Sequence, residues 1–385
     1  MKCANCGGTL RYDVAGYALA CDFCGQVKRL HRPEEGIVVG GMDFNAAIAA
    51  AGSKWGAARK LLNCKSCGAQ LLCDMDQMSG MCPFCGSAVV LSAEEANCGL
   101  APNAIIPFKI PKGPIEKRFY RWNKFAFWSP EKFRRGKLLE NLTPVYVPYW
   151  TFDTDTITTY TGRFGHTVGS GDSARTRWEQ KTGIVEKHFS NRTVCASRKF
   201  FSDTLLNSVT GFKTSELIPY EPEMLSGMSA EVATIGIDEA WNYVRLTDLK
   251  KDILKACESH EGADCSSNVQ YSTEFYNTNF KYVLAPVWLS GCKYGGKIYN
   301  VAASGTNGSA HCHRPLSIAK LITFLVLLTA YIVAANLLHM QFVFTNLGIA
   351  ALVVAFVIYI IRFFVTFSAQ ARDEGNDYSK LQNDQ

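Results

Sequence analysis

The chain has 385 residues, a formal net charge of +6 and an aromatic content of 12%. This length leaves room for two or three domains with a sizeable core, and the moderate charge combined with many aromatic residues excludes a largely disordered protein. The net charge is too small to indicate a polyanionic partner by itself.

The first thirty residues contain the pattern Cys-x-x-Cys-Gly twice, at 3–7 and at 21–25, with 14 residues between the inner cysteines. Two residues between cysteines allow one tight turn, a knuckle, to present both thiolates to a tetrahedral ion. The glycine that follows accepts the positive φ that such a turn needs. We therefore predict a zinc ribbon over 1–30, with no signal peptide before it.

The same pattern returns with the same spacing at 64–68 and 82–86. It predicts a second zinc ribbon over 61–92, joined to the first by a linker with a short helix over 31–60. Paired disulfides or a redox-active Cys-x-x-Cys are the competing explanations, but two equal spacings and four glycines favour metal. Reduced ligands indicate a reducing compartment. We expect two structural Zn2+ ions as the cofactors. The predicted metal ligands are Cys3, Cys6, Cys21, Cys24, Cys64, Cys67, Cys82 and Cys85.

The stretch 104–310 predicts one β-rich α+β domain. Its first part, 109–137, is basic and aromatic, and Pro114 is placed to begin a helix there. Such a helix could cover the β domain, contact anionic lipid or bind nucleic acid, and the first is the default. Strands are predicted at 145–152 and 282–289, helical periodicity covers 229–258, and a hairpin turn is expected at Gly295 and Gly296.

Two uncharged runs, 321–338 and 342–361, are each about as long as a helix that crosses a bilayer. They predict transmembrane helices over 318–338 and 342–367, followed by a disordered tail over 368–385. Lys and Arg flank the outer ends and are absent between them, so the positive-inside rule places both termini in the cytoplasm. The expected protein is a two-pass protein of the inner (cytoplasmic) membrane. Its expected class is α+β multidomain, with two N-terminal ribbons, a β-rich central domain and a C-terminal transmembrane hairpin.

Weaker signals concern chemistry outside the ribbons. Two groups could bind a further metal, a question that the sequence leaves open. These groups are Cys257 with His260 and Cys265, and His311 with Cys312 and His313. Asp153 and Asp155 share a predicted strand face, without an identifiable partner histidine. The phosphate-binding loop and the serine-hydrolase and metalloprotease motifs are missing, so we expect no enzymatic activity and no catalytic residue.

Short motifs follow the two ribbons in a fixed order. They are Ile-Pro-Phe-Lys at 106–109, Tyr-Val-Pro-Tyr-Trp-Thr-Phe-Asp at 146–153, Pro-Tyr at 219–220, Glu-Ala-Trp at 239–241 and Lys-Tyr-Val-Leu-Ala-Pro-Val-Trp at 281–288. In this order the chain resembles a family of bacterial zinc-ribbon membrane proteins. Members are often labelled primosomal-protein-N′-like, helicase-like or transcription-factor-IIB-type (TFIIB-type) zinc-ribbon proteins, and some are encoded beside a phage-shock PspA-like protein and a flotillin-like (SPFH-domain) protein. The resemblance implies a membrane recruiter of such partners.

The expected function is therefore that of a non-enzymatic, membrane-anchored adaptor that recruits cytoplasmic proteins to the inner membrane during membrane stress. PspA-like and SPFH/flotillin-like proteins and the lipid bilayer are the implied partners. The alternative is a membrane-tethered nucleic-acid-binding protein of replication or transcription. Between its two knuckles, the first ribbon has a single basic residue, Arg11, and the second ribbon has no Lys or Arg. Because binding to nucleic acid by counterion release needs clustered cations, the sequence favours protein partners.

Overall fold

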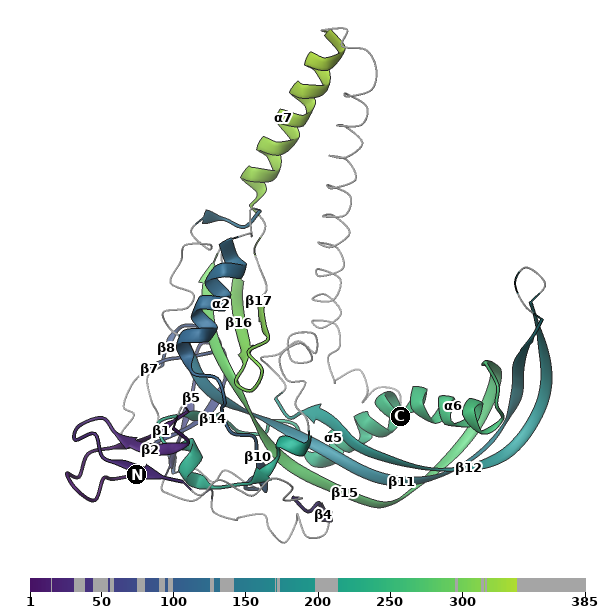
Figure 1. Ribbon diagram of the computed structural model, residues 1–385, viewed down its shortest axis with the longest axis horizontal. Helices are drawn as coiled ribbons and strands as arrows, with labels where there is room; N and C mark the ends of the chain where they lie inside the picture. Colours follow the sequence, from purple (N-terminus) through teal and green to yellow (C-terminus); the bar gives the residue numbers. More distant parts are fainter. Residues whose placement is uncertain are drawn as a thin grey trace.

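The protein is a strand-dominated structure, seen in a computed structural model (Figure 1). The structure describes residues 1–14, 16–30, 39–43, 55, 59–74, 80–89, 94–95, 100–124, 128–131, 142–169, 171, 174–197, 214–294, 297–312, 315 and 317–337. The first ribbon forms a three-stranded sheet of its own, from β1 (Leu10–Asp13), β2 (Ala18–Cys21) and β3 (Val27–Arg29). A two-stranded pair joins β7 (Gly80–Met81) to β8 (Ala88–Val89).

A twelve-stranded sheet forms the rest of the β-structure. Its strands are β4 (Met42–Asp43), β5 (Arg59–Asn63), β6 (Gln70–Asp74), β9 (Glu94–Glu95), β10 (Ala104–Ile105), β11 (Thr143–Val168), β12 (Arg175–Cys195), β13 (Ile218–Pro219), β14 (Ser229–Glu231), β15 (Cys265–Tyr294), β16 (Lys297–Ser304) and β17 (Ala310–Cys312). The strand order along its main path is β13-β10-β15-β11-β14-β6-β5-β9. The hairpin of the second ribbon, β5 and β6, is therefore part of the main sheet.

Helices are fewer than strands. The α-helices are α2 (Lys112–Lys124), α5 (Ile237–Tyr243), α6 (Leu249–His260) and α7 (Ile318–Leu337). α5 and α6 lie along the concave face of the long strands, and α7 projects away from the sheet (Figure 1). Short 3-10 turns occupy η2 (Thr214–Glu216) and η3 (Pro222–Leu225), and a π-helical turn, η4 (Val244–Asp248), connects α5 to α6. The helix predicted to begin near Pro114 and the hairpin predicted at 295–296 are confirmed, since α2 has Pro114 in its first turn and Tyr294 pairs with Lys297.

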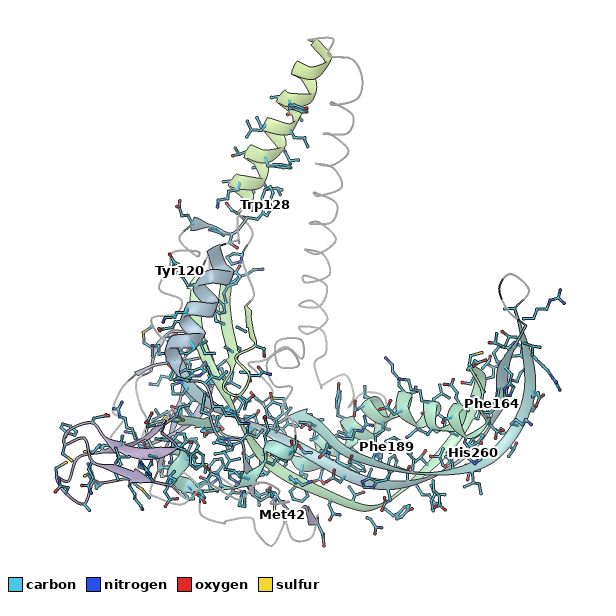
Figure 2. All side chains as sticks on the ribbon, in the orientation of Figure 1. Met42, Tyr120, Trp128, Phe164, Phe189 and His260 are labelled. Atoms are coloured by element: carbon cyan, nitrogen blue, oxygen red, sulfur yellow. The ribbon has the colours of Figure 1, made fainter. Side chains whose placement is uncertain are left out.

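Three very long strands extend from the body as a curved arm (Figure 1). β11, β12 and β15 have 26, 21 and 30 residues, and β11 pairs antiparallel with both of the others. At about 3.3 Å per residue, β15 follows a path of roughly 100 Å. α5 and α6 lie on the concave side, where the ring of Phe152 packs 5.3 Å from that of Trp241. Figure 2 places Phe164 and His260 toward the far end of this arm.

The central part of the sheet is buried on both faces. Along β11, Tyr146 and Trp150 enter one hydrophobic core, and Val145 and Val147 enter the other. This agrees with side chains alternating between the two faces of a strand. The first ribbon contributes Leu10 and Leu19, among others, to the Tyr146 core. The cysteine knuckles of the second ribbon enter the opposite core through Cys64 and Phe84, although Leu72 of β6 lies in the Tyr146 core. The knuckles of the two ribbons therefore pack against different faces.

The expected α+β class with a transmembrane hairpin is wrong, because the fold is predominantly β. The helix α7 does occupy the first apolar run. However, among the residues that the structure describes, no helix combines the length and apolar character needed to cross a membrane. This finding overturns both the helix predicted as a span over 318–338 and the two-pass inner-membrane localisation. The second predicted span, 342–367, and the tail, 368–385, lie outside the described residues.

The prediction failed because it counted uncharged residues, and such a run also suits a helix whose base packs on protein. Lys320 illustrates this: its Nζ donates a hydrogen bond to the carbonyl oxygen of Ser129 at 3.0 Å. One turn later, the ring of Phe324 contacts that of Trp128 with centroids 5.2 Å apart. Figure 2 shows Trp128 at the base of α7. The base of the helix is thus held by contacts with protein groups.

Candidate metal centres

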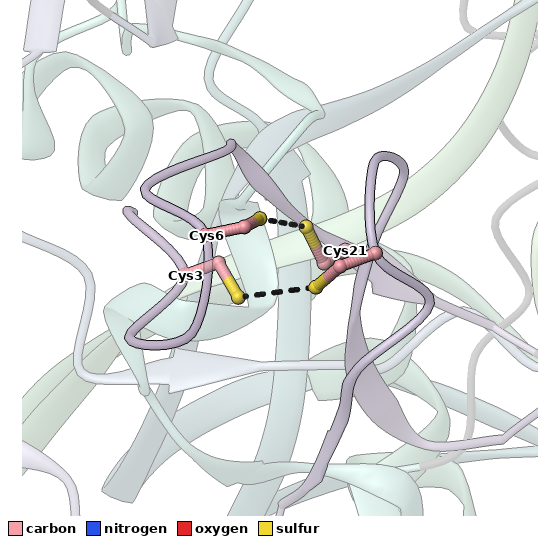
Figure 3. A group of neighbouring side chains, drawn as sticks. Cys3, Cys6 and Cys21 are labelled. Carbon is pink, nitrogen blue, oxygen red and sulfur yellow. Dashed lines mark hydrogen bonds between the residues drawn. The ribbon is translucent and has the colours of Figure 1, made fainter.

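Four cysteine sulfurs converge in each ribbon. In the first ribbon, the Sγ atoms of Cys3 and Cys24 lie 3.7 Å apart, and those of Cys6 and Cys21 lie 3.4 Å apart. Figure 3 shows the sulfurs of Cys6 and Cys21 facing each other beside the second pair. Within each group of four, all ligand atoms lie within 4.8 Å of one another. All eight predicted ligands are thereby brought together in the two groups that the sequence indicated.

The four knuckles share one backbone pattern. In each, the amide of the glycine donates to the carbonyl oxygen of the first cysteine, at 2.8 Å for Gly7, 3.0 Å for Gly25, 2.6 Å for Gly68 and 2.8 Å for Gly86. The φ angles of these four glycines lie between 69° and 76°. Only glycine adopts this region without strain, so the predicted reason for the glycine in each motif is confirmed.

The geometry fits a metal ion bound by four thiolates. A tetrahedral ion with metal–sulfur bonds of about 2.3 Å needs sulfurs about 3.8 Å apart. In the second ribbon, the Cys64–Cys85 and Cys67–Cys82 pairs are each 3.7 Å apart. The hydrogen bond from the Cys67 thiol lowers the pKa of Cys82 to about 5, and the same contact raises the pKa of Cys67. Without a cation only some of the sulfurs can ionise, and a divalent ion removes that conflict.

The two centres differ in their exposure. In the first ribbon, Cys6 and Cys24 are exposed, whereas Cys3 and Cys21 are buried. In the second, Cys64, Cys82 and Cys85 are buried and Cys67 is partly buried. The difference follows from the topology, because the second ribbon is built into the main sheet and the first has a separate sheet.

A short segment around residues 222–231 holds both ribbons. On the side of the first ribbon, the Tyr12 amide donates to the Ser226 carbonyl oxygen at 2.9 Å. On the side of the second, Arg59 forms a buried ion pair with Asp74 at 3.3 Å and donates to the carbonyl oxygen of Leu225. The other carboxylate oxygen of Asp74 accepts from the Gly227 amide at 2.7 Å. Both ribbons are therefore fixed to one short segment of the central domain.

Comparisons with known proteins add one relative and no family. No family model matches the chain, and no solved structure matches it. The chain is similar to an uncharacterized protein, YdjG, of Bacillus subtilis (strain 168). The two are 27% identical over 325 residues, which cover 83% of this chain and 91% of the relative. This similarity extends beyond the ribbons into the β domain, but it assigns no activity.

The weaker metal candidates are not assembled in the described part of the chain. Cys257 is buried between α6 and the arm, whereas the Cys265 sulfur lies against the carbonyl oxygen of Gly165 at 4.0 Å. His260 instead hydrogen-bonds through Nδ1 to the hydroxyl of Tyr160 at 2.7 Å. His311 and Cys312 lie on β17, but their side chains and the whole of His313 are outside the described residues.

The two aspartates on β11 do not form an acid pair. Asp153 binds Nζ of Lys281 at 2.5 Å and the backbone amide of Asn191 at 2.7 Å. Asp155 contacts Nδ1 of His188 at 2.7 Å, and this hydrogen bond lowers the pKa of the aspartate. Each carboxylate is thus bound by its own partners and not by the other carboxylate, as expected for residues that stabilise a strand.

Sequence reasoning missed a buried carboxyl group beside the second ribbon. Glu231 on β14 is 0% exposed, and its Oε1 accepts a hydrogen bond from the Ser197 hydroxyl at 2.5 Å. Its Oε2 has no hydrogen-bond partner among the described residues. Burial raises the pKa of Glu231 to about 8, so the group is mainly neutral at pH 7. No sequence signal pointed to it, because burial of a single glutamate depends on the sheet order.

Proposed function

We propose that this protein is a non-enzymatic adaptor, in which two zinc-stabilised ribbons and a β-rich domain bind partner proteins. The observation that carries the proposal is the closed ligand set of both metal centres. Four cysteine ligands fill a tetrahedral zinc ion and leave no position for a substrate, which is typical of structural sites. The thiolate-only set favours zinc over the harder divalent ions.

The long arm supports the same proposal. Because β11 and β15 extend far beyond the body, they expose a surface on which a partner interface of ordinary size can form. The resemblance noted in the sequence suggests PspA-like and SPFH/flotillin-like proteins as partners in a stress response.

The alternative, a nucleic-acid-binding protein, has one observation in its favour. Lys28 and Arg29 are both exposed on β3 of the first ribbon, and Lys2 is exposed at its start. Three cations on one small module could contact a phosphate backbone. The same ribbon also carries Asp13 and Asp22, which weakens such a patch.

A binding experiment with the purified full chain separates the two candidates. Metal content is measured first, and two zinc ions per chain are expected; iron with sulfide would contradict the assignment of zinc. Binding is then measured to a purified PspA-like protein, to an SPFH-domain protein, and to single- and double-stranded DNA over a range of salt. Nuclease-resistant binding to a protein supports the adaptor. Binding to DNA alone, with a steep salt dependence, supports the alternative, and binding to neither class rejects both.

A further inference from the structure

The second knuckles of the two ribbons are near copies in sequence and in backbone. One reads Cys-Asp-Phe-Cys-Gly and contains Phe23; the other reads Cys-Pro-Phe-Cys-Gly and contains Phe84. The amides of Cys21 and Cys82 donate to carbonyl oxygens five residues later, at 2.9 and 2.8 Å. The glycine that ends each knuckle has a φ of 69°. The two phenylalanines therefore occupy equivalent positions.

Phe23 and Phe84 differ in their exposure to solvent. Phe84 is 2% exposed and belongs to a hydrophobic core with Val287 and Leu289 of β15. Its knuckle lies flat on β15 at Gly291, where a Cβ atom would lie 2.5 Å from the carbonyl carbon of Phe84. Phe23 is 80% exposed. In one copy the knuckle is seated on a sheet, and in the other the same knuckle faces outward.

The exposed ring of Phe23 lies against the opposite knuckle. A Cβ atom on Gly8, in the opposite knuckle, would lie 2.6 Å from Cδ2 of Phe23, so the ring rests directly over that glycine. Val27 on β3, in the same small sheet, is 58% exposed. An exposed aromatic ring held in one position loses little conformational freedom on binding, which is the property of an interface anchor.

Charge on the first ribbon indicates the character of the partner. Arg11 is paired with Asp22 at 2.9 Å. Lys2, Lys28 and Arg29 are exposed, and within the described residues none of the three has a carboxylate partner. Because Asp22 is paired with Arg11, the three cations outnumber the remaining exposed carboxylate of the ribbon, Asp13, and a protein surface that carries acidic groups would complement them.

We propose that the Phe23 knuckle is the docking surface for a partner protein, and that it seats on an acidic β-sheet face of that partner over a glycine, as the Phe84 knuckle seats on Gly291. This inference rests on the proposed adaptor function and specifies the surface used. Protein is favoured over nucleic acid because the equivalent knuckle of this chain already shows a protein surface as its seat.

The contact is tested by placing a benzophenone-bearing photocrosslinking residue at position 23 of the full chain and irradiating cells. The matched control places the same residue at Tyr120, another exposed aromatic position, on α2 (72% exposed). The expected result is a crosslink from position 23, and not from 120, to one protein, at a strand with a glycine and neighbouring acidic residues. A crosslink to nucleic acid, to a second copy of this chain, or to a segment without those features overturns the proposal, as does no crosslink.

Binding to the protein identified in this way is then measured with purified full-length variants. Phe23→Ser is expected to weaken binding by about tenfold or more, as removal of an interface anchor does. Lys28→Glu is also expected to weaken binding, because it places a negative charge against the acidic surface of the partner. Zinc content and unfolding midpoint should stay unchanged, because both side chains are exposed. A side chain introduced at the partner's glycine should weaken binding as well. If Phe23→Ser leaves that binding intact, this proposal fails while the adaptor function stands; if no protein binds the unaltered chain, the adaptor function fails too.

Discussion

Gly291 of β15 lies directly against the backbone of Phe84 in the second ribbon. A Cβ atom at position 291 would lie 2.8 Å from the amide nitrogen of Cys85 and still closer to the carbonyl oxygen of Phe84. Backbone atoms of a knuckle have no rotamer by which to move away. The absence of a side chain at 291 is thus what allows a metal centre to rest on the central sheet.

Replacing this glycine should therefore loosen the second ribbon. We expect Gly291→Ala to lower the free energy of unfolding by about 1–3 kcal/mol, as overpacking of a buried site does. Urea unfolding of the zinc-loaded protein measures the effect. Gly113→Ala is the matched control, because a Cβ atom there meets nothing within 4 Å and alanine suits the helix α2. Equal stability of the two variants would show that the knuckle does not rest on β15.

The ion pair between Arg59 and Asp74 should contribute far more than the surface pairs. The Arg59 side chain is 3% exposed, and removing Asp74 leaves its charge buried without a carboxylate. We expect Asp74→Ala to destabilise the protein by about 3–5 kcal/mol. Lys112→Ala should change stability by less than about 0.5 kcal/mol, because its pairing with Glu116 on α2 is well exposed. Chemical denaturation of both variants provides the comparison, and similar small losses would contradict the role given to Arg59.

Metal should leave the two centres at different rates. Cys6 and Cys24 are exposed, whereas three ligands of the second centre are buried. A chelator in excess, with zinc release followed by a colorimetric indicator, should show two phases of equal amplitude, the faster from the first ribbon. Cys6→Ser should abolish the fast phase and keep the slow one. A single phase that accounts for both ions would contradict the difference in exposure.

The contribution of Glu231 to stability should fall as pH rises between its unfolded and folded pKa values. Its ordinary pKa of 4.5 is raised to about 8 by burial, so between these values the folded protein holds a proton that the unfolded chain releases. The stabilisation is therefore complete below pH 4.5 and lost as pH rises toward 8, by on the order of 5 kcal/mol at most. Glu231→Gln should flatten the dependence of unfolding free energy on pH between 6 and 8. The control Glu116→Gln, on the exposed side of α2, should retain it.

The metal centres could be predicted from the sequence because their chemistry is local. Each knuckle needs two cysteines and a glycine within five residues, and this spacing alone fixes the turn and the positive φ of Gly7 or Gly68. The helix at Pro114 and the turn before Lys297 are local in the same sense.

Features that depend on residues distant in the sequence could not be predicted. β6 pairs with β14, so that Leu72 lies opposite Ala230. The hydrophobic periodicity of either segment does not indicate which strand it pairs with. The class and the membrane hairpin were predicted wrongly for a related reason. A run without charged residues shows only that the helix lacks charges. It does not indicate that Lys320 and Phe324 contact the rest of the protein. The difference between Phe23 and Phe84 belongs here too, since only the sheet decides which copy is covered.

The segment at residues 222–231, which holds both ribbons, and Gly291, on which the second ribbon rests, also have a consequence for biosynthesis. Both ribbons emerge from the ribosome long before the segments on which they rest, because those segments lie more than a hundred residues later in the chain. For that interval a nascent ribbon has only its own short strands and whatever ion it has captured. Early zinc binding would keep the eight cysteine thiols bound to metal until the main sheet has been synthesised and covers the four cysteines of the second ribbon.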